Sequence, residues 1–128
     1  MKFSIIICAY NGEETLFRCL DAIKEINHPK ANYEVIAIDN ASTDRTFRIL
    51  TNYDIRVVGC RKYAKTSEVM KVGAKNAVFP NLLFINQRTV VKKDILNGNH
   101  LMKKDQDRRI DKRCQRLKDG KNLMKIYG

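Results

Sequence analysis

The side chains best suited to binding chemistry in this 128-residue sequence stand directly after its apolar runs. Residues 82–89 read LLFINQRT, an apolar run that stops abruptly at two amides and an arginine. The runs at 3–8 and 33–38 stop in the same way, at the sequences AYN and DNAS. Amides and carboxylates pair with the polar edges of a ligand, and an arginine binds an anionic group. The candidate binding residues are Ala9, Tyr10, Asn11, Asp39, Asn40, Asn86 and Arg88.

Each of these residues also has a purely structural interpretation. Tyr10 and Asn11 could close a strand and start a turn, and Asp39 with Asn40 could form an Asx turn. An arginine in a loop is commonly a solvated surface residue. The binding interpretation therefore depends on whether the fold brings the residues together.

The elements around these residues alternate between strand and helix. Continuous apolar runs at 3–8, 33–38, 55–60 and 82–85 predict strands that are covered on both faces. Helical spacing predicts helices over 13–26, from an N-cap at Thr43 or Asp44 through 53, and over 67–78. This order is typical of a parallel α/β sheet with right-handed crossovers, whose ligands bind beyond the carboxyl ends of the strands.

Composition bounds the class of protein. The length fits one domain with a substantial core, and no apolar run approaches the roughly 20 residues that span a bilayer. The start, MKFSIIICAY, is interpreted as a first strand and not as a signal peptide, so we predict a cytoplasmic protein. The four cysteines have no C-x-x-C pair, which argues against a zinc site and fits reduced thiols. No metal ligand is predicted.

Charge is unevenly distributed along the chain. Residues 1–55 carry a net charge of −2 and residues 56–128 a net charge of +13. We expect a binding domain over 1–95 and a basic helical segment over 96–128, with Ile110, Cys114 and Leu117 on one side. A basic segment favours an anionic partner, and we predict a membrane surface near a lipid-linked acceptor. We therefore also consider peripheral membrane association.

Two of the strand ends carry a family resemblance. The stretches SIIICAYNGEETLFRCLDAI and EVIAIDNASTDRT resemble the start of family 2 glycosyltransferases with the GT-A fold. The resemblance covers about residues 1–95 and implies a GT-A-like, Rossmann-like three-layer α/β fold with a mainly parallel sheet and flanking helices. It implies a nucleotide-sugar donor (UDP-, GDP- or dTDP-sugar), with Ala9 and Tyr10 lining the base pocket and Asp39 and Asn40 beside base and ribose.

The third stretch departs from the family pattern. LLFINQRT falls on a family motif whose last aspartate binds the Mg²⁺ or Mn²⁺ that bridges the diphosphate, and here that position is Arg88. An arginine could supply positive charge to the diphosphate directly and bidentately. The alternative is that the site lost its metal ligand because catalysis was no longer selected.

Three functions follow as hypotheses. The first is glycosyl transfer from a nucleotide sugar to an unknown acceptor; no catalytic base is identified, and Asp94, Asp105, Asp107 and Asp111 have no motif support. The second is an inactive binding or scaffold subunit, favoured by the short length, the missing metal aspartate and the missing base. A partner chain or a second copy could then supply the acceptor half. The third, a nucleic-acid binder, is disfavoured because the basic half lacks interleaved aromatic residues.

Overall fold

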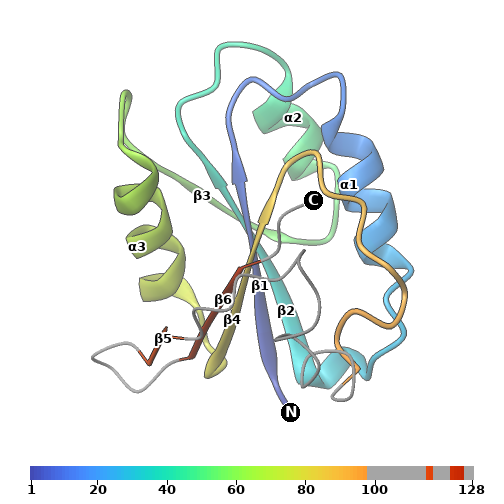
Figure 1. Ribbon diagram of the computed structural model, residues 1–128. Coiled ribbons are helices and arrows are strands. Elements are labelled where there is room, and N and C mark those ends of the chain that lie inside the picture. The colour runs from blue at the N-terminus through green and yellow to red at the C-terminus, as the bar shows by residue number, and fades with distance from the viewer. Residues whose placement is uncertain (98–114, 117–121, 126–128) are drawn as a thin grey trace.

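A computed structural model describes residues 1–97, 115–116 and 122–125 of the chain. At its centre is a six-stranded sheet in the order β3-β2-β1-β4-β6-β5 (Figure 1). The strands are β1 (Phe3–Ala9), β2 (Tyr33–Asp39), β3 (Arg56–Gly59), β4 (Asn81–Asn86), β5 (Gln115–Arg116) and β6 (Asn122–Lys125). Neighbouring strands are parallel except for β5 and β6, which are antiparallel. The predicted mainly parallel sheet is confirmed.

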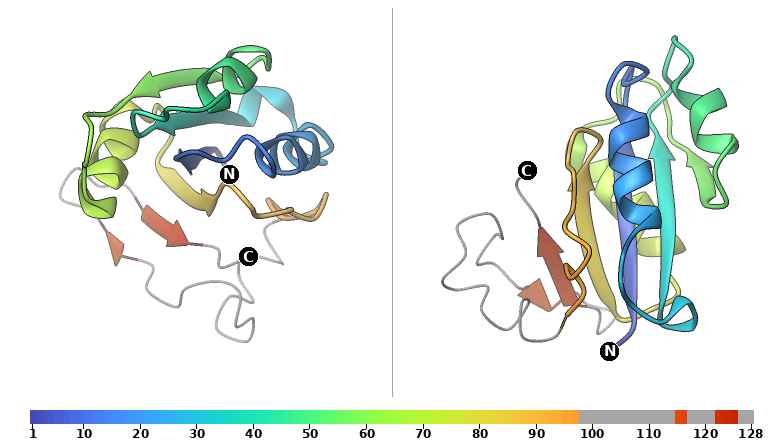
Figure 2. Two further views of the ribbon diagram at one scale, coloured as in Figure 1. Left: turned by 90° about the horizontal axis from the view of Figure 1, so that it is seen from above. Right: turned by 90° about the vertical axis from the view of Figure 1, so that its right-hand side faces the viewer.

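Helices cover both faces of the sheet and make the three predicted layers. They are α1 (Leu16–Lys24), α2 (Thr46–Thr51) and α3 (Thr66–Asn76), with a short 3-10 turn, η1 (Lys30–Asn32), before β2. Figure 2 shows α1 and α2 on one face and α3 on the other. None of the helices in the described part of the chain is long and apolar enough to cross a membrane.

Strand β1 serves both faces because its side chains alternate between them. Ile5 and Ile7 join the core beneath α1, whereas Ile6 joins the core beneath α3. All three side chains are buried. The continuous apolar run in the sequence therefore reflects a strand that is covered on both sides, as predicted.

Several element boundaries differ from those predicted. The first helix begins at Leu16, so Glu13 and Glu14 precede it instead of forming its first turn. The third helix ends at Asn76, four residues before Pro80. Strands β2 and β4 extend one residue further, to Asp39 and Asn86, because each pairs with β1 up to that point.

The prediction of a basic helix over 96–128 is wrong wherever the structure describes that segment. Residues 115–116 and 122–125 are strands, and β6 pairs in parallel with β4. The unpaired backbone edge of β4 offers hydrogen bonds that outweigh a weak helical pattern. Ile110, Cys114 and Leu117 lie outside the described residues. The domain boundary at 95 and the anionic partner of the segment stay predictions.

Asp44 caps the second helix, as predicted, but it stands one residue before the N-cap position and not at it. The helix begins at Thr46, and its N-cap, Arg45, makes no side-chain cap hydrogen bond. Instead, the Thr46 amide donates to Asp44 Oδ1 at 2.9 Å, and the amide of Glu13 donates to Asp44 Oδ2 at 3.2 Å. The alternative N-cap, Thr43, is not used. One carboxylate therefore ties the start of α2 to the loop after β1.

Gly73 allows α3 to approach the sheet. A Cβ at this position would lie 2.6 Å from Ile6 Cγ2, a β-branched methyl group in the core. We expect Gly73→Ala to lower the free energy of unfolding by about 1–3 kcal/mol through overpacking. Gly59→Ala is the matched control, because a Cβ there meets nothing within 4 Å, and we expect it to change stability by about 0.5 kcal/mol or less. Urea denaturation measures both, and equal effects would contradict the packing argument.

The stability supplied by Asp44 should depend on pH. Desolvation raises the pKa of Asp44, but the hydrogen bonds from Thr46 and Glu13 outweigh it and hold the pKa below its usual value. Such a carboxylate stabilises the fold above its unfolded pKa, about 3.9, and this contribution is lost as pH falls through the lower folded pKa. Asp44→Asn should therefore lower the melting temperature at pH 7, and the difference should shrink below about pH 4.

The control for this pH series is Asp54→Asn, since Asp54 is exposed and its carboxylate makes no hydrogen bond within the described residues. A difference between the Asp44→Asn and unaltered proteins that stays constant from pH 7 to pH 3 would contradict the assignment.

Candidate functional site

Two adjoining hollows lie at the carboxyl ends of the parallel strands. The first hollow, about 240 Å³, lies between the ends of β1, β2 and β4 and the start of α3. The second hollow, about 340 Å³, lies over the loop after β1. Gln87 lines both. The edge of the sheet where such folds bind ligands is therefore concave, and the two hollows meet at the Gln87 side chain.

The predicted residues divide between the two hollows. Register explains why they meet, because Ala9 lies opposite Asp39 and Cys8 lies opposite Asn86. The first hollow is lined by Ala9, Tyr10, Asn40 and Asn86, together with Thr66 and Val69 of α3. The second is lined by Asn11 and Arg88, together with Glu13, Glu14 and Asp44. Asp39 lines neither hollow.

Gln87 clamps the loop after β1 onto the end of β4. The Tyr10 amide donates to Gln87 Oε1 at 2.8 Å, and Gln87 Nε2 donates to the Tyr10 carbonyl at 3.0 Å. A Cβ on Gly12 would overlap the Gln87 side-chain amide, so a larger residue there would displace this clamp. Gln87 was not among the predicted site residues. Its signal was its place directly after a buried run, between two residues that were predicted.

A second network joins the loops after β1 and β2. The Asn11 amide donates to Ser42 Oγ at 3.0 Å, and the Thr43 amide donates to Asn11 Oδ1 at 2.8 Å. Asp39 accepts from the Ser42 hydroxyl through Oδ1 at 2.5 Å. Asn11 has a φ of 43°, in the left-handed region that asparagine tolerates. Asp39 therefore stabilises the loop after β2 and does not line either hollow.

Asn40 presents a buried hydrogen-bond acceptor. Its Nδ2 donates to the Ala64 carbonyl at 3.3 Å, in the loop between β3 and α3. Its Oδ1 is buried and has no hydrogen-bond partner among the described residues. Because the amide nitrogen faces the Ala64 carbonyl, the end of the amide that is left without a partner is the oxygen, which accepts hydrogen bonds. Asn40 lines the first hollow, and an unsatisfied acceptor on such a residue is suited to a ligand with an N–H or O–H group.

Arg88 places positive charge at the second hollow. Its side chain is exposed and forms no ion pair within the described residues. Two of the carboxylates around it are already engaged with backbone amides: Glu13 Oε2 accepts from Arg45, and Asp44 accepts from Glu13 and Thr46. The guanidinium therefore has no ion-pair partner in the described part of the chain, at a hollow that the carboxylates of Glu13, Glu14 and Asp44 also line.

The end of β4 does not fit a divalent metal ion. Asn86 Oδ1 accepts from the Arg88 backbone amide at 2.8 Å, and the Gln87 side-chain amide is hydrogen-bonded to the Tyr10 backbone. Arg88 is a cation and repels a metal ion. No group of three or more His, Cys, Asp or Glu side chains within the described residues could hold a metal. Hard cations need several oxygen ligands, which these three residues do not offer.

Two other groups that could take part in catalysis are a thiol nucleophile and a carboxylate base, and the described residues place neither of them ready to react at the hollows. Burial, and to a smaller extent Cys60, raises the pKa of the Cys8 thiol in the first hollow to about 11, so it stays protonated at neutral pH. The segment after β4 runs back along α1 (Figure 1), and the Lys93 carbonyl accepts from the Asn27 amide beyond the end of that helix. Asp94 therefore lies away from both hollows. Asp105, Asp107 and Asp111 lie outside the described residues.

Solved structures share this fold. Residues 1–349 of Staphylococcus aureus TarS match with a TM-score of 0.73 at 24% identity, over 86% of this chain and 34% of that chain. The TarS structure has also been solved with UDP-GlcNAc and with UDP. A Pyrobaculum calidifontis mannosyltransferase, in complex with GDP-Man and Mn²⁺, matches with a TM-score of 0.65 at 19% identity, over 74% of this chain and 30% of that chain. The GT-A-like fold is confirmed.

Sequence comparisons name the family. The poly(ribitol-phosphate) beta-glucosyltransferase of Bacillus spizizenii is 43% identical over 53 residues, which are 41% of this chain and 8% of that protein. The glycosyltransferase AglE of Haloferax volcanii is 40% identical over 50 residues, 39% of this chain and 16% of that protein. The match thus spans a small part of each relative. The model of glycosyl transferase family 2 matches residues 4–82, and the chain belongs to that family.

Proposed function

We propose that the two hollows bind a nucleotide-sugar donor, with the base in the first and the diphosphate and sugar at the second. The observation that carries this proposal is the buried, unpartnered Oδ1 of Asn40 at the strand ends. The N–H groups of a nucleobase edge would satisfy it, and Ala9 and Val69 supply apolar surface for the ring. The TarS complex with UDP makes UDP the first nucleotide to test.

Arg88 would then contact the diphosphate. Glycosyl transfer releases a nucleoside diphosphate, on which negative charge develops as the sugar bond breaks. A fixed cation stabilises this charge in the transition state and so lowers the activation barrier of the transfer. A guanidinium fork matches two phosphate oxygens, and the hollow that Arg88 lines adjoins the first hollow at Gln87. Glu14, also at the second hollow, is suited to accept hydrogen bonds from sugar hydroxyls.

A second candidate function is donor binding without turnover. It is favoured by the residues at the end of β4, which lack a metal-binding aspartate, and by the position of Asp94 away from the hollows. Both candidates predict nucleotide binding. Incubation with a labelled UDP-sugar and a panel of acceptors separates them, because only an active transferase releases UDP.

Nucleotide binding should raise thermal stability. UDP at 100 times its dissociation constant should stabilise the fold by about 2.7 kcal/mol. Asn40→Ala should weaken UDP binding about fivefold, the value of roughly one net hydrogen bond. Asn27→Ala is the matched control, because Asn27 is exposed and lies beyond the C-terminal end of α1, away from the hollows. This variant should bind UDP as the unaltered protein does. Thermal shift assays with UDP, GDP and dTDP measure this, and no shift with any of them at millimolar concentration would contradict the proposal.

A further inference from the structure

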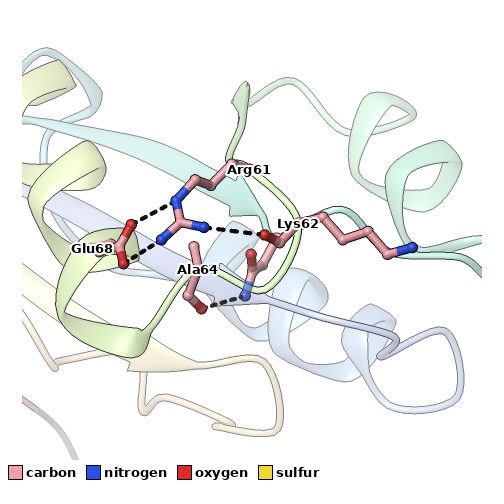
Figure 3. Close-up of polar contacts among 5 residues, drawn as sticks. Arg61, Lys62, Ala64 and Glu68 are labelled. Carbon is pink, nitrogen blue, oxygen red and sulfur yellow. Dashed lines mark hydrogen bonds and ion pairs between the residues drawn. The ribbon is translucent and has the colours of Figure 1, made fainter.

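An ion pair closes the loop that borders the first hollow. Arg61 Nε and Nη2 donate to the two carboxylate oxygens of Glu68, at 2.8 and 2.6 Å (Figure 3). We call this two-bond contact the Arg61–Glu68 fork. It joins the second residue after β3 to the first turn of α3, and both side chains remain accessible, at 64% and 36% exposure. The hydrogen bonds from Arg61 hold the pKa of Glu68 below its usual value, so the pair is charged at neutral pH.

The loop inside the fork is a strained turn. The Ala64 amide donates to the Arg61 carbonyl at 3.2 Å, and Tyr63 has a φ of 62°. The left-handed region is unfavourable for an aromatic residue and persists only where the surroundings impose it. Tyr63 is 81% exposed, so packing of its ring does not impose this conformation. The fork joins the two ends of residues 61–68, and together with the burial of Ala64 it holds the turn.

This turn also positions the Ala64 carbonyl, which orients the Asn40 side chain. Ala64 is buried, and its carbonyl accepts from Asn40 Nδ2. This bond decides which end of the Asn40 amide is engaged and leaves Oδ1 as the free acceptor. If Ala64 moved, the amide could rotate and offer a donor instead. The identity of the group shown to a ligand therefore depends on the turn.

We propose that Arg61 and Glu68 are positioning residues for base recognition. The fork holds the turn, the turn holds the Ala64 carbonyl, and the carbonyl fixes Asn40 with its oxygen as the acceptor. A site with a fixed acceptor favours bases that offer a donor at that point and disfavours those that offer a lone pair. This inference rests on the proposed nucleotide site and adds what sets its selectivity.

A positioning role is distinguishable from a stabilising one. An exposed ion pair contributes little to stability because water and salt screen it. Removing the fork should therefore leave the melting temperature close to that of the unaltered protein while changing which base is preferred. A residue that acts only through stability would lower the melting temperature and leave the base preference unchanged.

The binding test uses Arg61→Gln, Glu68→Gln and the exchanged pair Arg61→Glu with Glu68→Arg. Lys62→Gln is the matched control, since it removes a charge from the same loop. The Lys62 ammonium lies over the exposed Tyr63 ring, 5.1 Å from the ring centroid, and does not touch the fork carboxylate. Calorimetry gives dissociation constants for UDP, CDP and GDP. We expect each single fork variant to reduce the ratio between the best and worst base about fivefold. Lys62→Gln should keep the ratio, and the exchanged pair should restore part of it.

A second readout needs no nucleotide. In a ¹⁵N-resolved NMR spectrum, the two side-chain amide protons of Asn40, assigned by their absence in Asn40→Ala, should differ widely in shift because one is hydrogen-bonded. The fork variants should reduce that difference, and Lys62→Gln should not.

The two readouts separate the possible failures. If the unaltered protein prefers one base and the fork variants keep the same ratio, the positioning role is overturned while the nucleotide site stands. Binding of all three nucleotides without preference would also overturn it. If no nucleotide binds although the amide signal responds to the fork, the proposed function fails and the role in base recognition falls with it.

Discussion

Burial of β1 on both faces is the constraint on which the rest of the structure depends. Ile5 and Ile7 fill one core and Ile6 the other, so a register slip of one residue would put each side chain on the wrong side. The same register sets Ala9 opposite Asp39 and Cys8 opposite Asn86. Segments about 30 and 80 residues apart thus end at one edge, and the hollows exist because the core fixes this alignment.

Above that edge, the site is assembled from side chains that bind backbone groups. Gln87 holds Tyr10, Asn11 holds Thr43, and Asp44 holds the start of α2. Such contacts fix loops without using the groups that would face a ligand, namely Asn40 Oδ1 and the Arg88 guanidinium. Loops held in this way lose little conformational freedom when a ligand binds, which favours affinity.

The sequence was sufficient to predict the strands around β1, because an apolar run covered on both faces has a clear pattern. It also predicted that Ala9, Asn40 and Asn86 would meet, since parallel strands end at the same edge. The Gln87 clamp and the Arg61–Glu68 fork could not be predicted, because each depends on where a long side chain reaches in three dimensions. The strands at 115–116 and 122–125 were missed for a related reason: short segments become strands only by pairing, in this case alongside β4.

The central claim is that Arg88, and not a metal ion, neutralises the diphosphate of the donor. Calorimetric titration of UDP into the unaltered protein and Arg88→Ala, each with Mn²⁺ and with EDTA, tests it most directly. The account predicts equal affinity of the unaltered protein in Mn²⁺ and EDTA, and a loss of about 1.5–3 kcal/mol in Arg88→Ala, the range for a hydrogen bond to a charged group. Binding of UDP by the unaltered protein only in the presence of Mn²⁺ would contradict it, and so would metal-independent binding that Arg88→Ala leaves unchanged.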